Sequence, residues 1–271
     1  MAAHEELPRI GLGTWPALGD EAAEMVASAA AMGYPLIDTA QNYDNEAAVG
    51  EGIRRSGVAR DDLWIASKLR GKYQGRKTSR QAIEESLLRM RLDHFDLYMI
   101  HWPNPARGLY VDTWHDLVEA RDRGLVRRIG VCNFTVPMLD EITAATGVAP
   151  YVNQIELNPF WSRAEERAAH RERNILTEAY SPLGRGGGLL SDPLLVSLAE
   201  KYGAPVGTLV LAWEMSRGAT PLPKSASPER QRSNLAALDL GIDDEDLRAV
   251  DRLDGSHPES PLSDPMIYEQ L

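Results

Sequence analysis

The stretch DTAQNYDNE, residues 38 to 46, places a carboxylate and a phenol close together directly after the apolar run YPLI. The apolar run predicts a buried strand, and a carboxylate at the end of such a strand needs a partner because burying its charge alone is unfavourable. The Tyr43 phenol, with an ordinary pKa of about 10, is a weak acid at neutral pH. The hypothesis is therefore a proton-donating site, and the alternative is that Asp38 merely caps a turn.

Two further strand-like runs carry a lysine and a histidine near their ends. Lys68 ends WIASK and His101 follows DLYMI. An ammonium group at Lys68 would favour the tyrosinate form of Tyr43, and an ion pair with Asp38 would hold that ammonium in place. His101 would orient a carbonyl group toward the phenol, which makes a general acid for a carbonyl gaining negative charge. Taken singly, Lys68 could be a solvated loop residue and His101 a hydrogen-bonded core histidine.

Strand-like and helical runs alternate eight times along the chain. The expected strands lie in RIGLGTW, YPLIDTA, LWIASK, FDLYMIHW, VRRIGVCN, YVNQIEL, ILTEAYSPL and ATPLPK, and the expected helices span residues 20–32, 46–56, 79–92, 112–123, 135–145, 163–173, 192–202, 205–217, 228–236 and 243–253. Several strands are apolar on both faces, which is typical of a sheet covered by helices. The pattern favours an α/β fold, a (β/α)₈ TIM barrel with two extra helices and a short C-terminal tail, forming one domain over residues 1–271. The alternative is an open doubly wound sheet, but its G-x-G-x-x-G fingerprint is absent.

Polar side chains gather at the ends of these strands, where barrel enzymes place their active sites. Seven successive strand ends supply a group that can ionise or hydrogen-bond: Asp38 with Tyr43, Lys68, His101, Asn133, Gln154, Tyr180 and Lys224.

Composition narrows the class of protein. The 271 residues carry a formal net charge of −11, whereas a general nucleic-acid binder is expected to be basic, so any bound anion must be held by a local positive cluster. The single Cys132 excludes an internal disulfide and a multi-cysteine zinc site, and we expect no metal centre. The N-terminal residues lack signal-peptide features and no run reaches membrane-spanning length, so we expect a cytoplasmic protein without a membrane partner.

Seven motifs resemble, in order, those of the aldo-keto reductases: GYPLIDTAQNYDNEAAVG, WIASKL, DLYMIHWP, GLVRRIGVCNF, VNQIELNP, AYSPLGRG and LPKSASPERQRSN. The likeness is nearest to the short prokaryotic branch that includes diketogluconate reductases. It implies a barrel, often monomeric, that reduces small aldehydes or ketones with NADPH, diketo-sugar acids or dicarbonyls among them. It also implies that Tyr43 donates the proton, supported by Asp38, Lys68 and His101.

The resemblance assigns further residues to the cofactor and the substrate. Asn133 and Gln154 match residues that bind the nicotinamide carboxamide, although Asn133 could instead cap the helix that starts near residue 135. The remaining cofactor matches are Tyr180 on the nicotinamide ring, Ser181, Leu183 and Gly184 near the pyrophosphate, Lys224, Ser225 and Arg230 on the adenosine 2′-phosphate, and Asn234. Because the resemblance implies a 2′-phosphate site, NADPH is expected to be preferred over NADH. Trp15, Trp102 and His101 match substrate-pocket positions, and Trp161 with the tail 258–271 is expected to form a rim.

Three departures from the family pattern bear on these expectations. Cys132 replaces a usual serine, and a thiol is a poor hydrogen-bond donor to the carboxamide. Ser233 stands where many members have a glutamate facing the adenine, and Arg70 introduces a charge near the predicted substrate mouth. Two other functions stay open: an NADPH-binding regulatory or interaction barrel with vestigial reductase activity, and a metal-dependent barrel hydrolase or isomerase, which the lack of clustered ligands disfavours.

Overall fold

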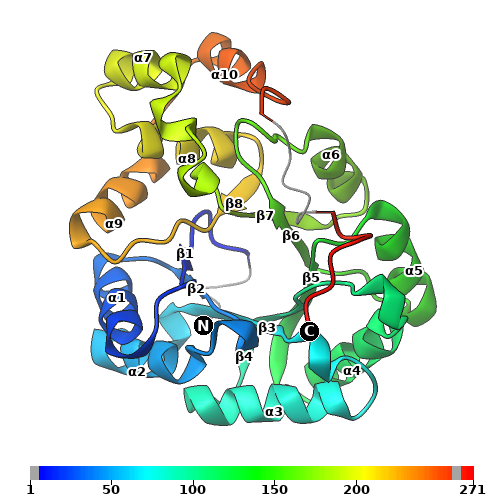
Figure 1. Cartoon of the computed structure of the whole chain (residues 1–271). Coiled ribbons are helices and arrows are strands. Elements are labelled where there is room, and N and C mark those ends of the chain that lie inside the picture. The colour runs from blue at the N-terminus through cyan, green and yellow to red at the C-terminus, as the bar shows by residue number, and fades with distance from the viewer. Residues whose placement is uncertain (1–5, 258–263) are drawn as a thin grey trace.

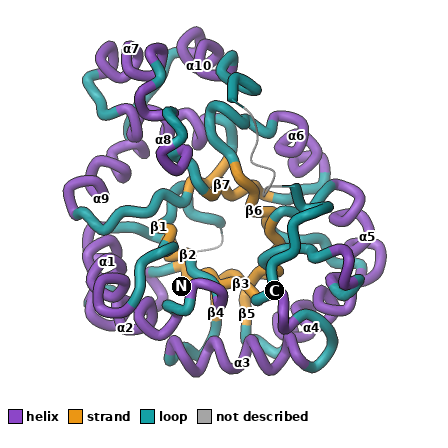
Figure 2. The backbone as a smooth tube through the Cα atoms, in the orientation of Figure 1, coloured by secondary structure: helices purple, strands orange, loops and turns teal. Residues whose placement is uncertain are grey.

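A computed structural model describes residues 6–257 and 264–271 of the chain. Eight parallel strands pair in sequence order, and the helices surround them (Figures 1 and 2). The strands are β1 (Leu12–Gly13), β2 (Leu36–Asp38), β3 (Trp64–Leu69), β4 (Phe95–Ile100), β5 (Val126–Cys132), β6 (Val152–Glu156), β7 (Leu176–Tyr180) and β8 (Ala219–Pro221). The helices are α1 (Gly19–Met32), α2 (Glu46–Ser56), α3 (Thr78–Met90), α4 (Tyr110–Asp122), α5 (Val136–Thr146), α6 (Ala164–Glu172), α7 (Pro193–Tyr202), α8 (Val206–Ser216), α9 (Pro228–Leu235) and α10 (Asp244–Asp251).

Backbone hydrogen bonds between the β1 region and the end of β8 close the sheet. The Gly11 amide donates to the Pro221 carbonyl at 3.0 Å, and the Gly13 amide donates to the Pro223 carbonyl at 3.1 Å. The two chain segments approach so closely that a Cβ on Gly13 would lie 2.8 Å from the carbonyl oxygen of Leu222. The predicted closed barrel is therefore confirmed and the open sheet is excluded.

The two extra helices lie after the last two strands. β7 is followed by both α7 and α8, and β8 by both α9 and α10, so that α7 and α10 lie at the periphery of the ring (Figure 1).

Local signals fix the helix ends: Asp192 accepts hydrogen bonds from two backbone amides at the start of α7, and Gly33 ends α1 with a φ of 104°. Every predicted helix is present, with ends that agree to within two residues.

Alternation along β3 explains how a lysine enters the barrel. Trp64 and Ala66 belong to the apolar cluster inside the barrel, whereas Ile65 and Leu69 belong to the cluster between strands and helices. Side chains two residues apart on a strand share a face, so Lys68 continues the inward series of Trp64 and Ala66 at the C-terminal end of the strand. The apolar interior thus forms a floor beneath Lys68.

Among the residues that the structure describes, no single helix has the length and apolar character needed to cross a membrane. The pair α7 and α8 meets the test only when taken together, and it bends by 92° at the break.

Candidate active site

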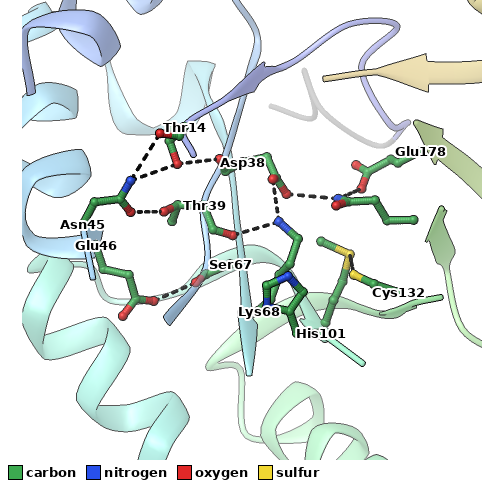
Figure 3. A network of polar contacts seen from close by, with 12 residues as sticks. Thr14, Asp38, Thr39, Asn45, Glu46, Ser67, Lys68, His101, Cys132 and Glu178 are labelled. Carbon is green, nitrogen blue, oxygen red and sulfur yellow. Dashed lines mark hydrogen bonds and ion pairs between the residues drawn. The ribbon is translucent and has the colours of Figure 1, made fainter. Parts of the chain in front are cut away.

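Asp38 and Lys68 form a buried ion pair at the C-terminal end of the barrel (Figure 3). Lys68 Nζ lies 2.5 Å from Asp38 Oδ2 and donates a second hydrogen bond to the Thr39 carbonyl at 3.0 Å. Burial lowers the pKa of Lys68, but the negative charge of Asp38 and the neighbouring Tyr43 more than offset this, so that the pKa lies above its ordinary value. The lysine is therefore a fixed positive charge at neutral pH.

The short 3-10 helix Gln41–Tyr43 after β2 brings Tyr43 beside this pair. Lys68 Nζ lies 5.2 Å from the centroid of the Tyr43 ring. Burial raises the pKa of Tyr43 and the positive charge of Lys68 opposes the rise, with a net value above the ordinary one. The expected lowering by Lys68 is present, but burial outweighs it. The phenol thus holds its proton at neutral pH, and Lys68 limits the penalty for losing it.

His101 packs against Tyr43 as a neutral imidazole. The two ring centroids lie 5.6 Å apart with an interplanar angle of 76°. Burial, and then the charge of Lys68, hold the pKa of His101 well below its usual range. A neutral ring carries an N–H on one nitrogen, which can donate a hydrogen bond to a carbonyl oxygen without adding a charge. Tyr43 and His101 therefore offer two donors on the same wall of the site.

A cavity of about 620 Å³ opens above these residues. Its lining contains many of the predicted site residues: Trp15, Asp38, Tyr43, His101, Trp102, Asn133, Gln154, Tyr180, Ser181, Leu183, Gly184 and Lys224. Lys68 does not line the cavity, because it is fully buried behind Asp38 and Tyr43. The structure therefore brings the predicted catalytic and nicotinamide residues together around one space.

Hydrogen bonds fix the orientation of Asn133. Its Oδ1 accepts from the Tyr180 hydroxyl at 3.0 Å, and its Nδ2 donates to the His101 carbonyl at 3.3 Å. Asn133 has a positive φ of 61° and lies outside α5, whose N-cap is Thr135. The alternative that Asn133 caps this helix is therefore wrong.

Gln154 connects the ion pair to a carboxyl group that sequence reasoning missed. Its Nε2 donates to Asp38 Oδ1 at 3.1 Å and to Glu178 Oε2 at 2.8 Å. Glu178 lies on β7, completely buried inside the barrel. Burial, and then the charge of Asp38, raise its pKa to about 8. The one signal in the sequence was an acidic residue inside the otherwise apolar run ILTEAY.

A positive cluster lies at the other end of the predicted cofactor site. Lys224 lines the cavity, and next to it the Arg230 Nε donates to Ser225 Oγ at 3.4 Å. Within residues 6–257 and 264–271, neither Lys224 nor Arg230 forms an ion pair. Ser227 Oγ caps α9 by accepting from the Arg230 amide at 3.3 Å. Two unpaired cations and a helix N-terminus are the features of an anion site.

Ser225, Arg230 and Asn234 do not line the cavity itself. Asn234 is buried on α9, close to the Tyr34 hydroxyl, which donates to the Gln231 carbonyl at 3.1 Å. The hydroxyl of Ser233 lies 3.0 Å from Thr208 Oγ1, so this departure from the family pattern turns the side chain toward α8.

The glycine-rich loop after β7 carries another residue that the sequence did not single out. The Arg185 guanidinium lies 5.6 Å from the Tyr180 ring centroid and 5.7 Å from that of Trp15, and its Nε donates to Ser181 Oγ. Ser181, Gly184 and Arg185 all have positive φ values, which bend the loop over the cavity. Arg185 thus covers the ring of Tyr180 in this conformation.

Aromatic residues and the C-terminal tail form the opposite wall. Trp102 is buried and packs against Tyr268 of the tail, with ring centroids 4.5 Å apart and an interplanar angle of 59°. Trp15 and Trp161 also line the cavity. Tyr268 and Gln270 line the cavity, so the expected rim is confirmed for residues 264–271, and residues 258–263 lie outside the described part of the chain. Arg70 does not line the cavity; its Nε donates to the backbone oxygen of Leu271 at 3.3 Å, next to Gln270 of the cavity wall.

Comparisons with known proteins agree with this geometry. Residues 9–255 match the model of the Aldo/keto reductase family. The chain is 46% identical over 244 residues to 2,5-diketo-D-gluconic acid reductase B of Corynebacterium sp. (strain SHS752001), covering 90% of this chain and 88% of that protein. It is 40% identical over 249 residues to methylglyoxal reductase DkgA of Yersinia pestis, covering 92% of this chain and 89% of that protein.

A solved structure of a Gox0644 variant in complex with NADPH has a TM-score of 0.91 and 38% identity, covering 97% of this chain and 95% of that chain. The family match spans all eight strands and the cavity-lining residues up to Lys224, while Tyr268 and Gln270 of the tail lie beyond it. The relatives also confirm the resemblance to the diketogluconate reductase branch. This chain is a member of the aldo/keto reductase family.

Proposed function

We propose that the protein reduces small aldehydes and ketones to alcohols with NADPH. The observation that carries the proposal is the cluster of Tyr43, Lys68, Asp38 and His101 at one wall of an enclosed cavity. A buried phenol that keeps its proton, next to a fixed ammonium group, suits the donation of a proton to an oxygen that gains negative charge.

The residues present fit a nicotinamide dinucleotide. Asn133 and Gln154 offer amide groups, and Tyr180 offers an aromatic face with its hydroxyl held by Asn133. Lys224 and Arg230 offer uncompensated positive charge in a protein whose net charge is −11, as a 2′-phosphate requires. When bound, NADPH supplies a hydride to the carbonyl carbon, and the protein positions and polarises the reactants.

The side chains of this protein would then complete the reduction at the carbonyl oxygen. His101 and Tyr43 donate hydrogen bonds that hold the oxygen. Tyr43 transfers its proton to this oxygen as the hydride reaches carbon, which yields the alcohol and a tyrosinate. Lys68 stabilises the tyrosinate, and Asp38 keeps Lys68 in place. The tyrosinate regains a proton from solvent before the next cycle.

Dicarbonyls and keto-sugar acids are the substrates that we favour. The curated relatives are named for a diketogluconic acid and for methylglyoxal. The cavity combines aromatic walls from Trp15, Trp102 and Tyr268 with the polar groups of Tyr43 and His101, which suits small carbonyl compounds of several kinds.

Consumption of NADPH, followed by absorbance with a panel of aldehydes, methylglyoxal and a diketogluconate, tests the proposal. Tyr43→Phe is expected to abolish turnover because the ring stays and only the proton donor is lost, while NADPH still quenches protein fluorescence with the wild-type affinity. If the wild type turned over no carbonyl compound yet bound NADPH, the result would favour a regulatory barrel. Activity that required added metal would favour a hydrolase or isomerase instead.

A second test addresses the choice of cofactor. Replacing both Lys224 and Arg230 by alanine is expected to weaken NADPH binding by about 10²- to 10⁴-fold, because each charge-assisted hydrogen bond contributes roughly 1.5–3 kcal/mol. Binding of NADH, which lacks the 2′-phosphate, is expected to change little. Arg232→Ala is the matched control, since Arg232 lies on the same helix but lines a different surface groove. Unchanged NADPH affinity in the double variant would contradict the assignment.

A further inference from the structure

The amide nitrogen of Gln154 is shared between two carboxyl groups inside the barrel. One N–H of Nε2 points to Asp38 on β2 and the other to Glu178 on β7, at 3.1 Å and 2.8 Å. Figure 3 shows this chain of contacts running from Lys68 through Asp38 to Glu178. Both N–H groups of the Gln154 side chain are therefore engaged by carboxyl groups of the protein itself.

This arrangement leaves one atom of the Gln154 amide for a ligand. Gln154 lines the cavity, and no described residue donates a hydrogen bond to its Oε1. Turning the amide over would place this carbonyl oxygen against the Asp38 carboxylate, which is ion-paired with Lys68 and accepts hydrogen bonds but does not donate them. If only Asp38 were present, one N–H of the Gln154 amide would be held by a hydrogen bond and the other would have no acceptor. With Glu178 as well, both are fixed.

The neighbouring side chains leave the Gln154 carbonyl oxygen as the main hydrogen-bond acceptor for a ligand amide. The Sγ of Cys132, which replaces the serine of the family pattern, lies 3.8 Å from the Met99 sulfur and is a weak partner for any ligand. The Oδ1 of Asn133 already accepts from Tyr180. Of the three side chains that match the carboxamide site, Gln154 thus offers the one strong acceptor that is not already engaged within the protein.

We propose that Glu178 is a positioning residue that locks the Gln154 amide so that its carbonyl oxygen accepts a hydrogen bond from the amide group of the nicotinamide ring. The inference rests on the proposed function, because it requires a nicotinamide cofactor in the cavity. Glu178 itself touches neither cofactor nor substrate. It acts through Gln154, and a carboxyl oxygen can accept the Gln154 hydrogen bond whether the group is ionised or protonated.

A cofactor analogue that lacks the amide N–H groups tests the inference directly. The reduced 3-acetylpyridine analogue of NADPH carries a methyl ketone in place of the carboxamide, so it cannot donate to Gln154. Dissociation constants of NADPH and of this analogue are measured by quenching of protein fluorescence, for the wild type, Glu178→Met and Glu178→Gln. Methionine fills the space but accepts poorly, whereas glutamine keeps a carbonyl acceptor at the same position.

The expected result is selective. Glu178→Met weakens NADPH binding about 3- to 10-fold, the effect of one hydrogen bond, and leaves binding of the analogue unchanged. Glu178→Gln keeps both affinities close to those of the wild type. Glu214→Gln is the control, since Glu214 is also fully buried but lies on α8 and does not line the cavity. It is expected to change neither dissociation constant.

Equal weakening of both nucleotides by Glu178→Met would overturn the inference, because it would show a general structural role. Unchanged binding of NADPH to Glu178→Met would also overturn the inference. Should Glu178→Met fail to fold, Glu178→Leu, which also removes the acceptor, is measured in its place, with the same expected and contradicting results. If the wild-type protein bound neither NADPH nor the analogue, the proposed function would fail together with the inference. If the wild type bound both nucleotides but Glu178→Met did not weaken NADPH binding, only the inference would fail.

Discussion

The pair of Asp38 and Lys68 illustrates how a single buried charge constrains its neighbours. Lys68 is completely buried, and its ammonium group is satisfied by Asp38 and by the Thr39 carbonyl. Such a pair contributes little net stability compared with apolar residues of the same volume, but losing one partner leaves an uncompensated buried charge. The main effect of the Asp38–Lys68 pair is therefore to hold a positive charge beside the Tyr43 phenol, and not to stabilise the fold.

Lys68→Met is expected to reduce both stability and activity. Asp38 would lose its counter-ion, at a cost of about 3–5 kcal/mol in the free energy of unfolding. Tyr43 would lose the charge that opposes the effect of burial on its pKa, so kcat for carbonyl reduction should fall by about 10²- to 10⁴-fold. Urea denaturation and steady-state kinetics measure the two effects.

A double variant separates these effects. Adding Asp38→Asn to Lys68→Met removes the stranded charge and is expected to restore much of the stability while leaving kcat low. A double variant as unstable as Lys68→Met alone would show that the loss of stability comes from packing and not from the unpaired carboxylate.

At the scale of elements, local signals made the helices and the strand ends predictable. Helix caps such as Gly33 depend on backbone conformation within a few residues. The polar residues at the ends of β2 to β6 directly follow apolar runs, which are a local pattern in the sequence. Glu178 was missed because its role comes from Asp38 and Gln154, which lie on other strands. A contact between residues that are far apart in the chain leaves no local pattern.

The tail is the clearest case of such a contact. Asn104, in the loop after β4, forms two hydrogen bonds with the backbone of Gln270: its Nδ2 donates to the carbonyl at 3.0 Å, and its Oδ1 accepts from the amide at 2.8 Å. The tail then passes so close to the loop after β3 that a Cβ on Gly71 would lie 1.7 Å from the Gln270 carbonyl oxygen. Gly71 is therefore required by the tail and not by its own backbone conformation.

Gly71→Ala is expected to displace the tail from the cavity. Loss of the wall formed by Tyr268 and Gln270 should raise KM for carbonyl substrates roughly fivefold, as expected for about 1 kcal/mol of lost contact, with NADPH affinity unchanged. Carboxypeptidase should also remove the C-terminal residues faster. Gly241→Ala is the control, because a Cβ there meets nothing within 4 Å. Equal KM values in the two variants would contradict a tail that contacts the substrate.

At the scale of the whole molecule, positive side chains lie at the cavity although the net charge of the protein is negative. The protein carries −11 overall, yet Lys68 lies at the centre of the barrel and Lys224 lies at the edge of its cavity. An acidic surface with local positive charge in a cavity confines anion binding to that cavity, because fields from exposed charges are screened by salt within about 10 Å. The barrel thus places the positive charge of Lys224 at the edge of the same cavity that Asp38, the partner of Lys68, lines.

The buried carboxyl group of Glu178 should leave a signature in the stability of the whole protein. Its pKa is raised from 4.5 to about 8 in the folded state, first by burial and then by Asp38. As pH rises between these two values, the unfolded chain loses this proton while the folded chain keeps it. The unfolded state therefore binds fewer protons, and the stability of the folded state falls with increasing pH.

Glu178→Gln removes this titration but keeps the hydrogen-bonding shape of the side chain. The difference in Tm between the variant and the wild type is expected to grow in favour of the variant from about pH 5 to about pH 8, by several degrees in total. Other shifted groups, such as His170 with its pKa lowered to about 4, are present in both proteins and cancel in the difference. Thermal unfolding across this pH range makes the measurement. Parallel Tm profiles would mean that Glu178 titrates alike in the folded and unfolded states, which its complete burial beside Asp38 contradicts.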